Sequence, residues 1–225
     1  LMIDTKPSLK DRSNFNAKIA AFFGFSIFGT NHTFALNPDG SIAYDVINKF
    51  LDEYGKSNFF VFGFTNQVYE NLFLNLKTNL LNHNFSNGIL IHGGGWKKMI
   101  NIKVNNETFK KNLFNKIKLS KVFNYYGLVE QTGSIFIECE KCSSLVTSIF
   151  SDIIIRDQNF NVQINGKKGF IQVISLLPSS YPGHSLLTED IGEIVSNNCD
   201  CSTIGKRFKI YGRIKNAEIR GCSDI

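Results

Sequence analysis

The sequence predicts an α/β fold in which a parallel sheet with flanking helices is followed by a smaller β-rich subdomain. Helical and strand-like segments alternate over residues 1–133, which is typical of parallel strands joined by right-handed crossovers. From Gly133 onward, short apolar runs separated by turn residues replace the helical periods. The chain has 225 residues, of which 43% are hydrophobic and 20% charged, a composition that indicates one globular core with an appended subdomain.

The first half begins its clear helical pattern after Ser41, which suits an N-cap, and places apolar residues on one face over 43–54. Gly55 is placed to end that helix. Residues 59–64 are a continuous apolar run, as expected of a strand buried on both faces. Thr65 is a candidate cap for the next helix, whose apolar positions extend over 68–80.

A second strand is predicted over 89–91, a weaker helix over 109–117 and a third strand over 122–126. The apolar stretch 19–28 has the length of a buried helix and is shorter than the roughly 20 residues that cross a bilayer. No secretory signal pattern precedes it. We therefore expect no membrane span.

The second half predicts short strands, over 135–139, 153–156, 170–176, 191–195 and 208–211. Asn165-Gly166 and Pro182-Gly183 supply turns between them. Few helical periods remain, so this part of the chain is expected to be a β-rich subdomain.

Charge and cysteine content restrict the partners and the compartment. The net charge of +6 favours an anionic partner such as a nucleotide, a nucleic acid or a carboxylate. Five cysteines are too few for a disulfide-stapled secreted scaffold of this size. Together with the missing signal, they predict a reducing cytoplasm.

Four loops carry residues suited to chemistry, and ligands of open α/β sheets bind beyond the carboxyl ends of the strands. Gly93, Gly94 and Gly95 allow close approach of backbone to a ligand, or form a tight turn. Tyr126, Gly127 and Glu130 offer a ring, an approachable backbone and a metal-binding carboxylate. Adjacent carboxylates at Glu189 and Asp190 can bind a ribose diol or form a solvated acidic turn, and Gly212-Arg213 places a cation at a strand end.

In their order and spacing these loops resemble the adenylate-forming superfamily. The chain is most similar to the acyl-protein synthetases, the long-chain-fatty-acid–protein ligases of bacterial bioluminescence, which are related to phenylacetate–coenzyme A ligases. The segments that carry the resemblance are 61–65, 91–97, 126–135, 151–157, 181–190 and 212–224.

The resemblance implies ATP-dependent conversion of a fatty or related carboxylic acid to an acyl-adenylate, with Mg²⁺ as the metal. It places Tyr126 and Gly127 at the nucleotide and Glu130 at magnesium. It places Gly93, Gly94 and Gly95 beside adenine, Asp190 at the ribose hydroxyls, and Gly212 with Arg213 at the nucleotide and a hinge. Arg213, helped by Lys97, would offset the charge that develops at the α-phosphate.

Cys222 matches the cysteine that receives the acyl group as a thioester in this family. Arg220 is close in sequence and would favour the thiolate, which is the nucleophilic form. The alternative is an inert thiol in the C-terminal tail. A fatty-acyl reductase or another acyl-acceptor protein is the partner that the resemblance implies.

The remaining cysteines are spaced as Cys-x2-Cys and Cys-x-Cys, at Cys139, Cys142, Cys199 and Cys201. Four thiolates can complete a tetrahedral zinc site, and related ligases pair a Glu-Cys segment with a later Cys-x-Cys in this way. The alternative is four buried or free thiols.

The chain departs from the superfamily pattern in lacking an upstream Ser/Thr/Gly-rich phosphate loop and a C-terminal domain with a catalytic lysine. We therefore interpret it as the C-terminal portion of such an enzyme. The expected parts are an incomplete nucleotide-binding subdomain (1–133), a β-rich subdomain (134–213) and a hinge and tail (214–225).

Two other functions remain open at this point. One is a catalytically incomplete nucleotide- or acyl-binding fragment that works with a partner chain. The other is a zinc-bearing basic module for nucleic acid, which we do not expect because the lysines are scattered and no nucleic-acid motif appears.

Overall fold

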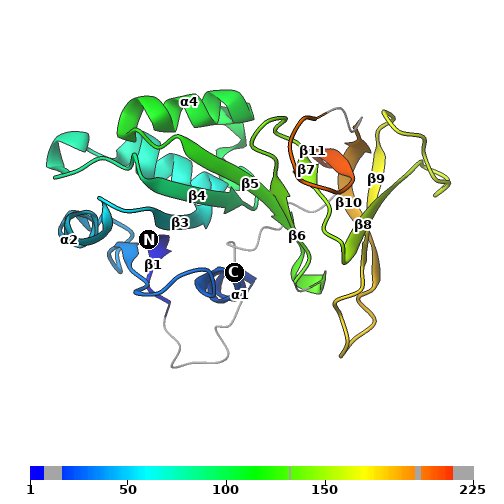
Figure 1. Cartoon of the computed structure of the whole chain (residues 1–225), viewed down its shortest axis with the longest axis horizontal. Coiled ribbons are helices and arrows are strands. Elements are labelled where there is room, and N and C mark those ends of the chain that lie inside the picture. Colours follow the sequence, from blue (N-terminus) through cyan, green and yellow to red (C-terminus); the bar gives the residue numbers. More distant parts are fainter. Residues whose placement is uncertain (8–16, 132, 196–198, 215–225) are drawn as a thin grey trace. The chain divides into compact units, whose positions relative to one another are not determined.

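The computed structural model describes residues 1–7, 17–131, 133–195 and 199–214, apart from the side chains of residues 17, 97, 98 and 100 (Figure 1). The chain divides into two compact units, and the first runs from Leu1 to Phe123 while the second begins at Asn124. None of the helices in these described ranges has the length and apolar character needed to cross a membrane.

The first unit contains a parallel sheet in the strand order β2-β1-β3-β4. Its elements are β1 (Met2–Thr5), α1 (Ala17–Ser26), β2 (Phe34–Leu36), α2 (Tyr44–Tyr54), β3 (Phe59–Phe64), α3 (Thr65–Val68), η2 (Tyr69–Asn75), η3 (Thr78–Leu80), β4 (Gly88–Gly93), η4 (Lys97–Ile102), α4 (Asn106–Ile117) and the start of β5 (Lys121–Gly127). The predicted parallel sheet is confirmed, and β3 has the predicted bounds.

Helices cover both faces of this sheet. Alternate side chains of β3 point to opposite faces and are apolar, so each face needs a helix to bury them. Phe59 meets Phe50 of α2 edge-to-face, with ring centroids 5.3 Å apart. Phe62 stacks on Phe25 of α1, with centroids 4.1 Å apart. In Figure 1, α4 lies on one side of the strands and α1 on the other. Burying each such Phe contributes about 1.5–3 kcal/mol relative to leaving it exposed.

Two predicted helix caps are wrong, because their hydroxyl groups have other partners. The N-cap of α2 is Ala43, and the Ser41 hydroxyl donates to Asp39 Oδ1 at 2.6 Å within the preceding turn. The N-cap of α3 is Phe64, and Thr65 is the first helical residue. The Thr65 hydroxyl instead contacts the end of β4.

The second unit is an antiparallel sheet in the strand order β5-β6-β7-β11-β10-β9-β8. Its elements after β5 are η5 (Val129–Gln131), β6 (Ile135–Glu138), β7 (Leu145–Val146), β8 (Ser151–Arg156), β9 (Gly169–Ser175), β10 (Ser185–Ile194) and β11 (Arg207–Arg213). Phe136, Ile153, Val173 and Phe208 are among the residues of its core. The β-rich second half of the prediction is confirmed.

The division between the units falls inside β5, between Phe123 and Asn124, whereas the sequence pattern places it after residue 133. The end of β5 belongs to the second unit because Tyr125–Gly127 pair antiparallel with Ile135–Ile137 of β6. β10 also begins earlier than predicted, at Ser185. The sequence pattern missed its first half because exposed and partly buried side chains alternate there, with no continuous apolar run.

Candidate functional site

Three residues from three strands of the second unit meet in one polar cluster. The Tyr126 hydroxyl donates to Asp190 Oδ2 at 2.7 Å, and Asp190 Oδ1 lies 3.8 Å from Arg213 Nε. Asp190 and Arg213 are direct cross-strand partners on β10 and β11. The Asp190 side chain is 16% exposed and that of Arg213 47%, so the cluster is partly open to solvent. The structure therefore brings together three of the predicted nucleotide-binding residues.

Packing holds the Tyr126 hydroxyl in this cluster. Tyr126 is the cross-strand partner of Phe136, and their rings stack with centroids 6.1 Å apart. Burial, and next the neighbouring Asp190 charge, raise the pKa of Tyr126 far above its usual value. The phenol therefore stays protonated and keeps donating to Asp190.

The Asp190 backbone is fixed by Thr188. The Asp190 amide donates to Thr188 Oγ1 at 3.2 Å, and the Thr188 hydroxyl donates to the Ile171 carbonyl at 2.9 Å. A carboxylate offers more acceptor positions than Tyr126 uses. Asp190 can therefore accept from two vicinal hydroxyls while Arg213 supplies a cation beside them.

Glu130 lies in η5, directly after β5. Its side chain is exposed and makes no hydrogen bond or ion pair with any side chain that the structure describes. Its carboxylate can therefore bind a cation, as magnesium binding would require. Gly127, before this turn, pairs with Ile135 in the ladder between β5 and β6.

Gln131 is a residue that the sequence analysis missed. Its side chain is fully buried, and Nε2 donates to the Gly183 carbonyl at 2.8 Å and to the Val173 carbonyl at 3.4 Å. These bonds tie the turn that carries Glu130 to β9 and to the loop before β10. The sequence gives only an amide beside a glutamate, which does not distinguish a buried tether from a surface residue.

The glycine loop belongs to the first unit. Gly93 ends β4, and its carbonyl accepts from Thr65 Oγ1 at 3.0 Å. Gly94 has φ +79°, and a Cβ there would lie 2.6 Å from Phe64 Cδ1. Gly95 has φ +73° with nothing within 4 Å of the position of a Cβ. Both residues are exposed, so their backbone groups can meet a ligand.

His92 precedes this loop and is buried. The Thr65 hydroxyl has one proton and donates it to the Gly93 carbonyl, so it accepts from His92 Nδ1, 3.0 Å away. Burial, and next the charge of Lys110, lower the pKa of His92 to about 3. His92 is therefore neutral with the proton on Nδ1.

Three of the four cysteines predicted to bind zinc lie close together in the structure. The sulfur atoms of Cys139, Cys142 and Cys199 all lie within 4.8 Å of one another, and those of Cys139 and Cys199 are 3.8 Å apart. Cys201 Sγ lies outside this group of three and accepts a hydrogen bond from Arg207 Nη2 at 2.8 Å. Thiolates about 2.3 Å from a tetrahedral zinc ion lie about 3.8 Å from one another. The spacing of these three sulfur atoms therefore fits that of zinc ligands.

Two predicted catalytic residues are not placed. Cys222 lies outside the described residues, and so does the side chain of Lys97, whose backbone begins η4.

The sequence profile described as acyl-protein synthetase, LuxE, matches residues 1–225. The chain belongs to the LuxE acyl-protein synthetase family. No curated protein matches this family member.

Solved structures that resemble this LuxE-family chain include a CoA ligase, an amide bond synthetase and a luciferase-like enzyme. A 2-hydroxyisobutyryl-CoA ligase, solved with 2-HIB-AMP and CoA, gives a TM-score of 0.64 at 16% identity, covering 83% of this chain and 39% of its own. The amide bond synthetase McbA from Marinactinospora thermotolerans gives 0.52 at 13% identity, covering 77% and 35%. The luciferase-like enzyme of the mealworm Zophobas morio gives 0.50 at 18% identity, covering 79% and 42%.

These comparisons confirm the predicted family and fold class, which is that of the large domain of adenylate-forming enzymes. The LuxE-family chain spans between a third and about two fifths of the solved enzymes that it resembles. The ligands of the individual site residues stay predictions.

Proposed function

We propose that this LuxE-family chain takes part in the ATP-dependent activation of a carboxylic acid as an acyl-adenylate. The observation that carries the proposal is the cluster of Tyr126, Asp190 and Arg213, which combines a partly exposed carboxylate with a fixed donor and a cation. Membership of the acyl-protein synthetase family supports it.

In the proposed reaction, an oxygen of the substrate carboxylate bonds to the α-phosphorus of ATP. The bond between that phosphorus and the bridging oxygen breaks, and pyrophosphate leaves with its electron pair. Asp190 accepts from the ribose hydroxyls and Arg213 offsets negative charge at the phosphates, with Lys97 as a second candidate cation. Glu130 would hold Mg²⁺, which when bound neutralises the charge of the leaving pyrophosphate.

The proposal extends to transfer of the acyl group to Cys222. The Cys222 thiolate attacks the acyl-adenylate carbonyl, the C–S bond forms and AMP leaves. Resemblance to the acyl-protein synthetases further supports a long-chain fatty acid as substrate and a fatty-acyl reductase as the acyl-accepting partner. The low cysteine content supports a cytoplasmic location.

A structural zinc ion held by Cys139, Cys142, Cys199 and Cys201 is part of the same proposal. The distance of 3.8 Å between Cys139 Sγ and Cys199 Sγ supports it, because a disulfide is far shorter and unrelated thiols have no reason to converge.

Acid-dependent exchange of label between pyrophosphate and ATP tests the activation step. We expect Asp190→Asn to weaken ATP binding about 10- to 100-fold, because a hydrogen bond to a charged group contributes about 1.5–3 kcal/mol. Glu189→Gln is the matched control, since Glu189 is exposed and adjacent in sequence. Equal ATP affinity in the two variants would contradict the role of Asp190.

Covalent labelling with a radioactive fatty acid tests the transfer step. We expect Cys222→Ser to abolish stable labelling and to leave pyrophosphate exchange unchanged, because the thiol acts after the adenylate has formed. Labelling that survives the substitution would exclude Cys222 as the acceptor.

A second candidate function is nucleotide or acyl binding without catalysis, in a chain that needs a partner. ATP binding without any acid-dependent exchange would support this function over the first.

A further inference from the structure

Arg207 is a buried cation that contacts the cysteine cluster. It is 4% exposed and is the first residue of β11, the strand that ends with Arg213. Its Nη2 donates to Cys201 Sγ at 2.8 Å and to the Thr203 carbonyl at 2.9 Å, and Nη1 donates to the Gly205 carbonyl at 3.4 Å. Its Nε is buried without a partner among the described residues.

A buried guanidinium needs a compensating negative charge, because removing it from water is costly. The carbonyls of Thr203 and Gly205 satisfy N–H groups but carry no net charge. Sulfur is therefore the contact that can neutralise Arg207, provided that Cys201 is a thiolate. Metal binding keeps cysteine in that form.

The cluster needs Arg207 for a complementary reason. Four thiolates around one zinc ion carry more negative charge than the metal neutralises, and N–H donors around the sulfurs offset the surplus. Lys141 Nζ donates to the Asp200 carbonyl at 2.9 Å, so the charged end of Lys141 also lies beside the loop between Cys199 and Cys201.

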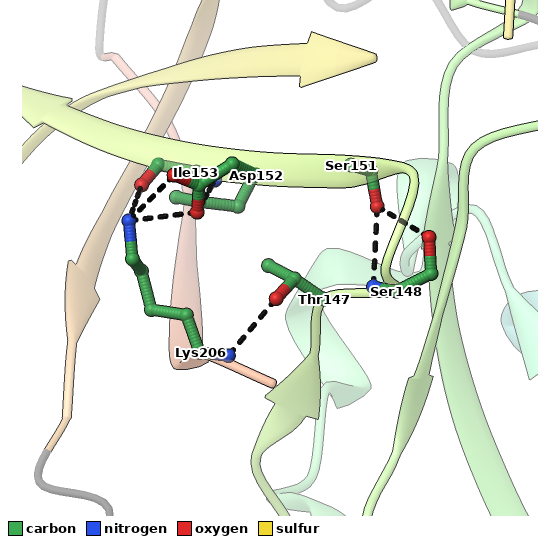
Figure 2. A network of polar contacts seen from close by, with 6 residues as sticks. All are labelled: Thr147, Ser148, Ser151, Asp152, Ile153 and Lys206. Atoms are coloured by element: carbon green, nitrogen blue, oxygen red, sulfur yellow. Dashed lines mark hydrogen bonds and ion pairs between the residues drawn. The ribbon is translucent and has the colours of Figure 1, made fainter. Parts of the chain in front are cut away.

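Lys206, next to Arg207 in sequence, has a separate set of partners (Figure 2). Its Nζ lies 2.7 Å from Asp152 Oδ1 and donates to the Ile153 carbonyl at 2.8 Å, and its amide donates to Thr147 Oγ1 at 2.9 Å. None of these bonds reaches a cysteine. The two adjacent cations thus fix the start of β11 to different neighbours.

We propose that Arg207 is a positioning residue that holds Cys201 in place as the fourth ligand of a zinc site formed with Cys139, Cys142 and Cys199. This inference rests on the zinc site of the proposed function. Cys201 lies outside the group of three sulfurs that fit within 4.8 Å of one another, and Arg207 is the side chain that reaches it.

The test is the affinity of the full chain for zinc, measured by competition with a chromophoric chelator in the presence of a reductant. We expect Arg207→Met to lower zinc affinity about 10- to 100-fold, as loss of an outer-sphere partner does at other metal sites. Arg207→Lys should recover part of the loss, because an ammonium keeps the charge without the planar fork. Lys206→Met is the matched control and should bind zinc as the wild type does.

A cobalt-substituted chain provides a readout that a purely structural role would not move. Loss of the N–H···S bond in Arg207→Met should shift the sulfur-to-cobalt charge-transfer absorption, and Lys206→Met should leave it in place. Zinc affinity and a cobalt spectrum unchanged in Arg207→Met would overturn the proposal.

A measurement on the wild type keeps the test decisive if Arg207→Met does not fold. Bound zinc should protect Cys201 from alkylation to the same extent as Cys139. Alkylation of Cys201 at equal rates with and without zinc would overturn the proposal, as would a wild-type chain that binds no zinc. Pyrophosphate exchange reads the ligase proposal separately, so the two failures are distinguishable.

Discussion

At the residue scale, two buried groups show how burial sets protonation in this chain. The Tyr126 phenol stays protonated beside Asp190, which makes it a donor. The His92 imidazole stays neutral beside Thr65, which makes its Nε2 an acceptor that is buried without a partner among the described residues. Both states depend on neighbours distant in sequence, since 64 positions separate Tyr126 from Asp190 and 27 separate Thr65 from His92.

Because His92 is buried in its neutral form, we expect the stability of the fold to fall at acid pH. The pKa of His92 is about 3 in the folded chain, against 6.5 for an ordinary histidine, so below about pH 6.5 the unfolded chain takes up a proton that the folded chain does not. The free energy of unfolding should therefore fall as the pH falls, by about 1.4 kcal/mol per pH unit from this residue.

His92→Gln tests this prediction, because glutamine does not titrate. Urea unfolding measured at several pH values between about 6 and 4 should give a shallower decline for the variant than for the wild type. The comparison uses the slopes, so a constant loss of stability from the substitution does not affect it. Parallel declines would contradict the assignment of His92 as buried and neutral.

At the element scale, the end of β4 and the start of α3 form one hydrogen-bonded unit. The Thr65 hydroxyl joins His92 and Gly93, so it cannot also cap its own helix. Gly94 and Gly95 follow with left-handed backbone, a conformation that costs other residues about 1–2 kcal/mol.

We expect substitution by alanine to cost more stability at Gly94 than at Gly95. Gly94→Ala should lower the free energy of unfolding by the backbone strain plus about 1–3 kcal/mol of overpacking, because its Cβ would lie 2.6 Å from Phe64 Cδ1. Gly95→Ala should incur the backbone strain alone, since nothing lies within 4 Å. Denaturant unfolding of the pair measures the difference, and equal losses would contradict the steric argument.

In the second unit, one strand serves both polar sites. β11 begins at Arg207, beside the cysteine cluster, and ends at Arg213, beside Asp190. Its pairing with β10 brings Arg213 opposite Asp190. A shift of register by one residue would turn these side chains to opposite faces, so the geometry of the nucleotide cluster depends on correct pairing along β11.

At the scale of the whole molecule, the net charge of +6 attracts anions without selecting among them. We expect binding to arbitrary DNA to weaken steeply between about 50 mM and about 200 mM salt, because counterion release drives it. ATP binding should persist over that range, since specific contacts at Asp190 and Arg213 add to the charge. Fluorescence anisotropy of labelled DNA and of labelled ATP measures both, and ATP binding that is lost in step with DNA binding would contradict the specific contacts at Asp190 and Arg213.

The sequence by itself determined the class of the fold and the order of its motifs. The buried run 59–64 marks a strand whatever surrounds it, and alternation of helix and strand patterns dictates parallel pairing. The short strands β1, β2 and β7 escaped prediction because two to four residues carry too little periodicity to indicate a strand.

Only the tertiary structure decided which side chains meet. It brought Tyr126 to Asp190 and Arg213, gathered the sulfurs of Cys139, Cys142 and Cys199, added Arg207 beside Cys201, and buried Gln131 behind Glu130. Residue types and spacing identify candidates for such contacts. Strand register and the direction of each side chain are set by pairing between distant segments, so the contacts themselves follow from the packed sheet and not from the local sequence.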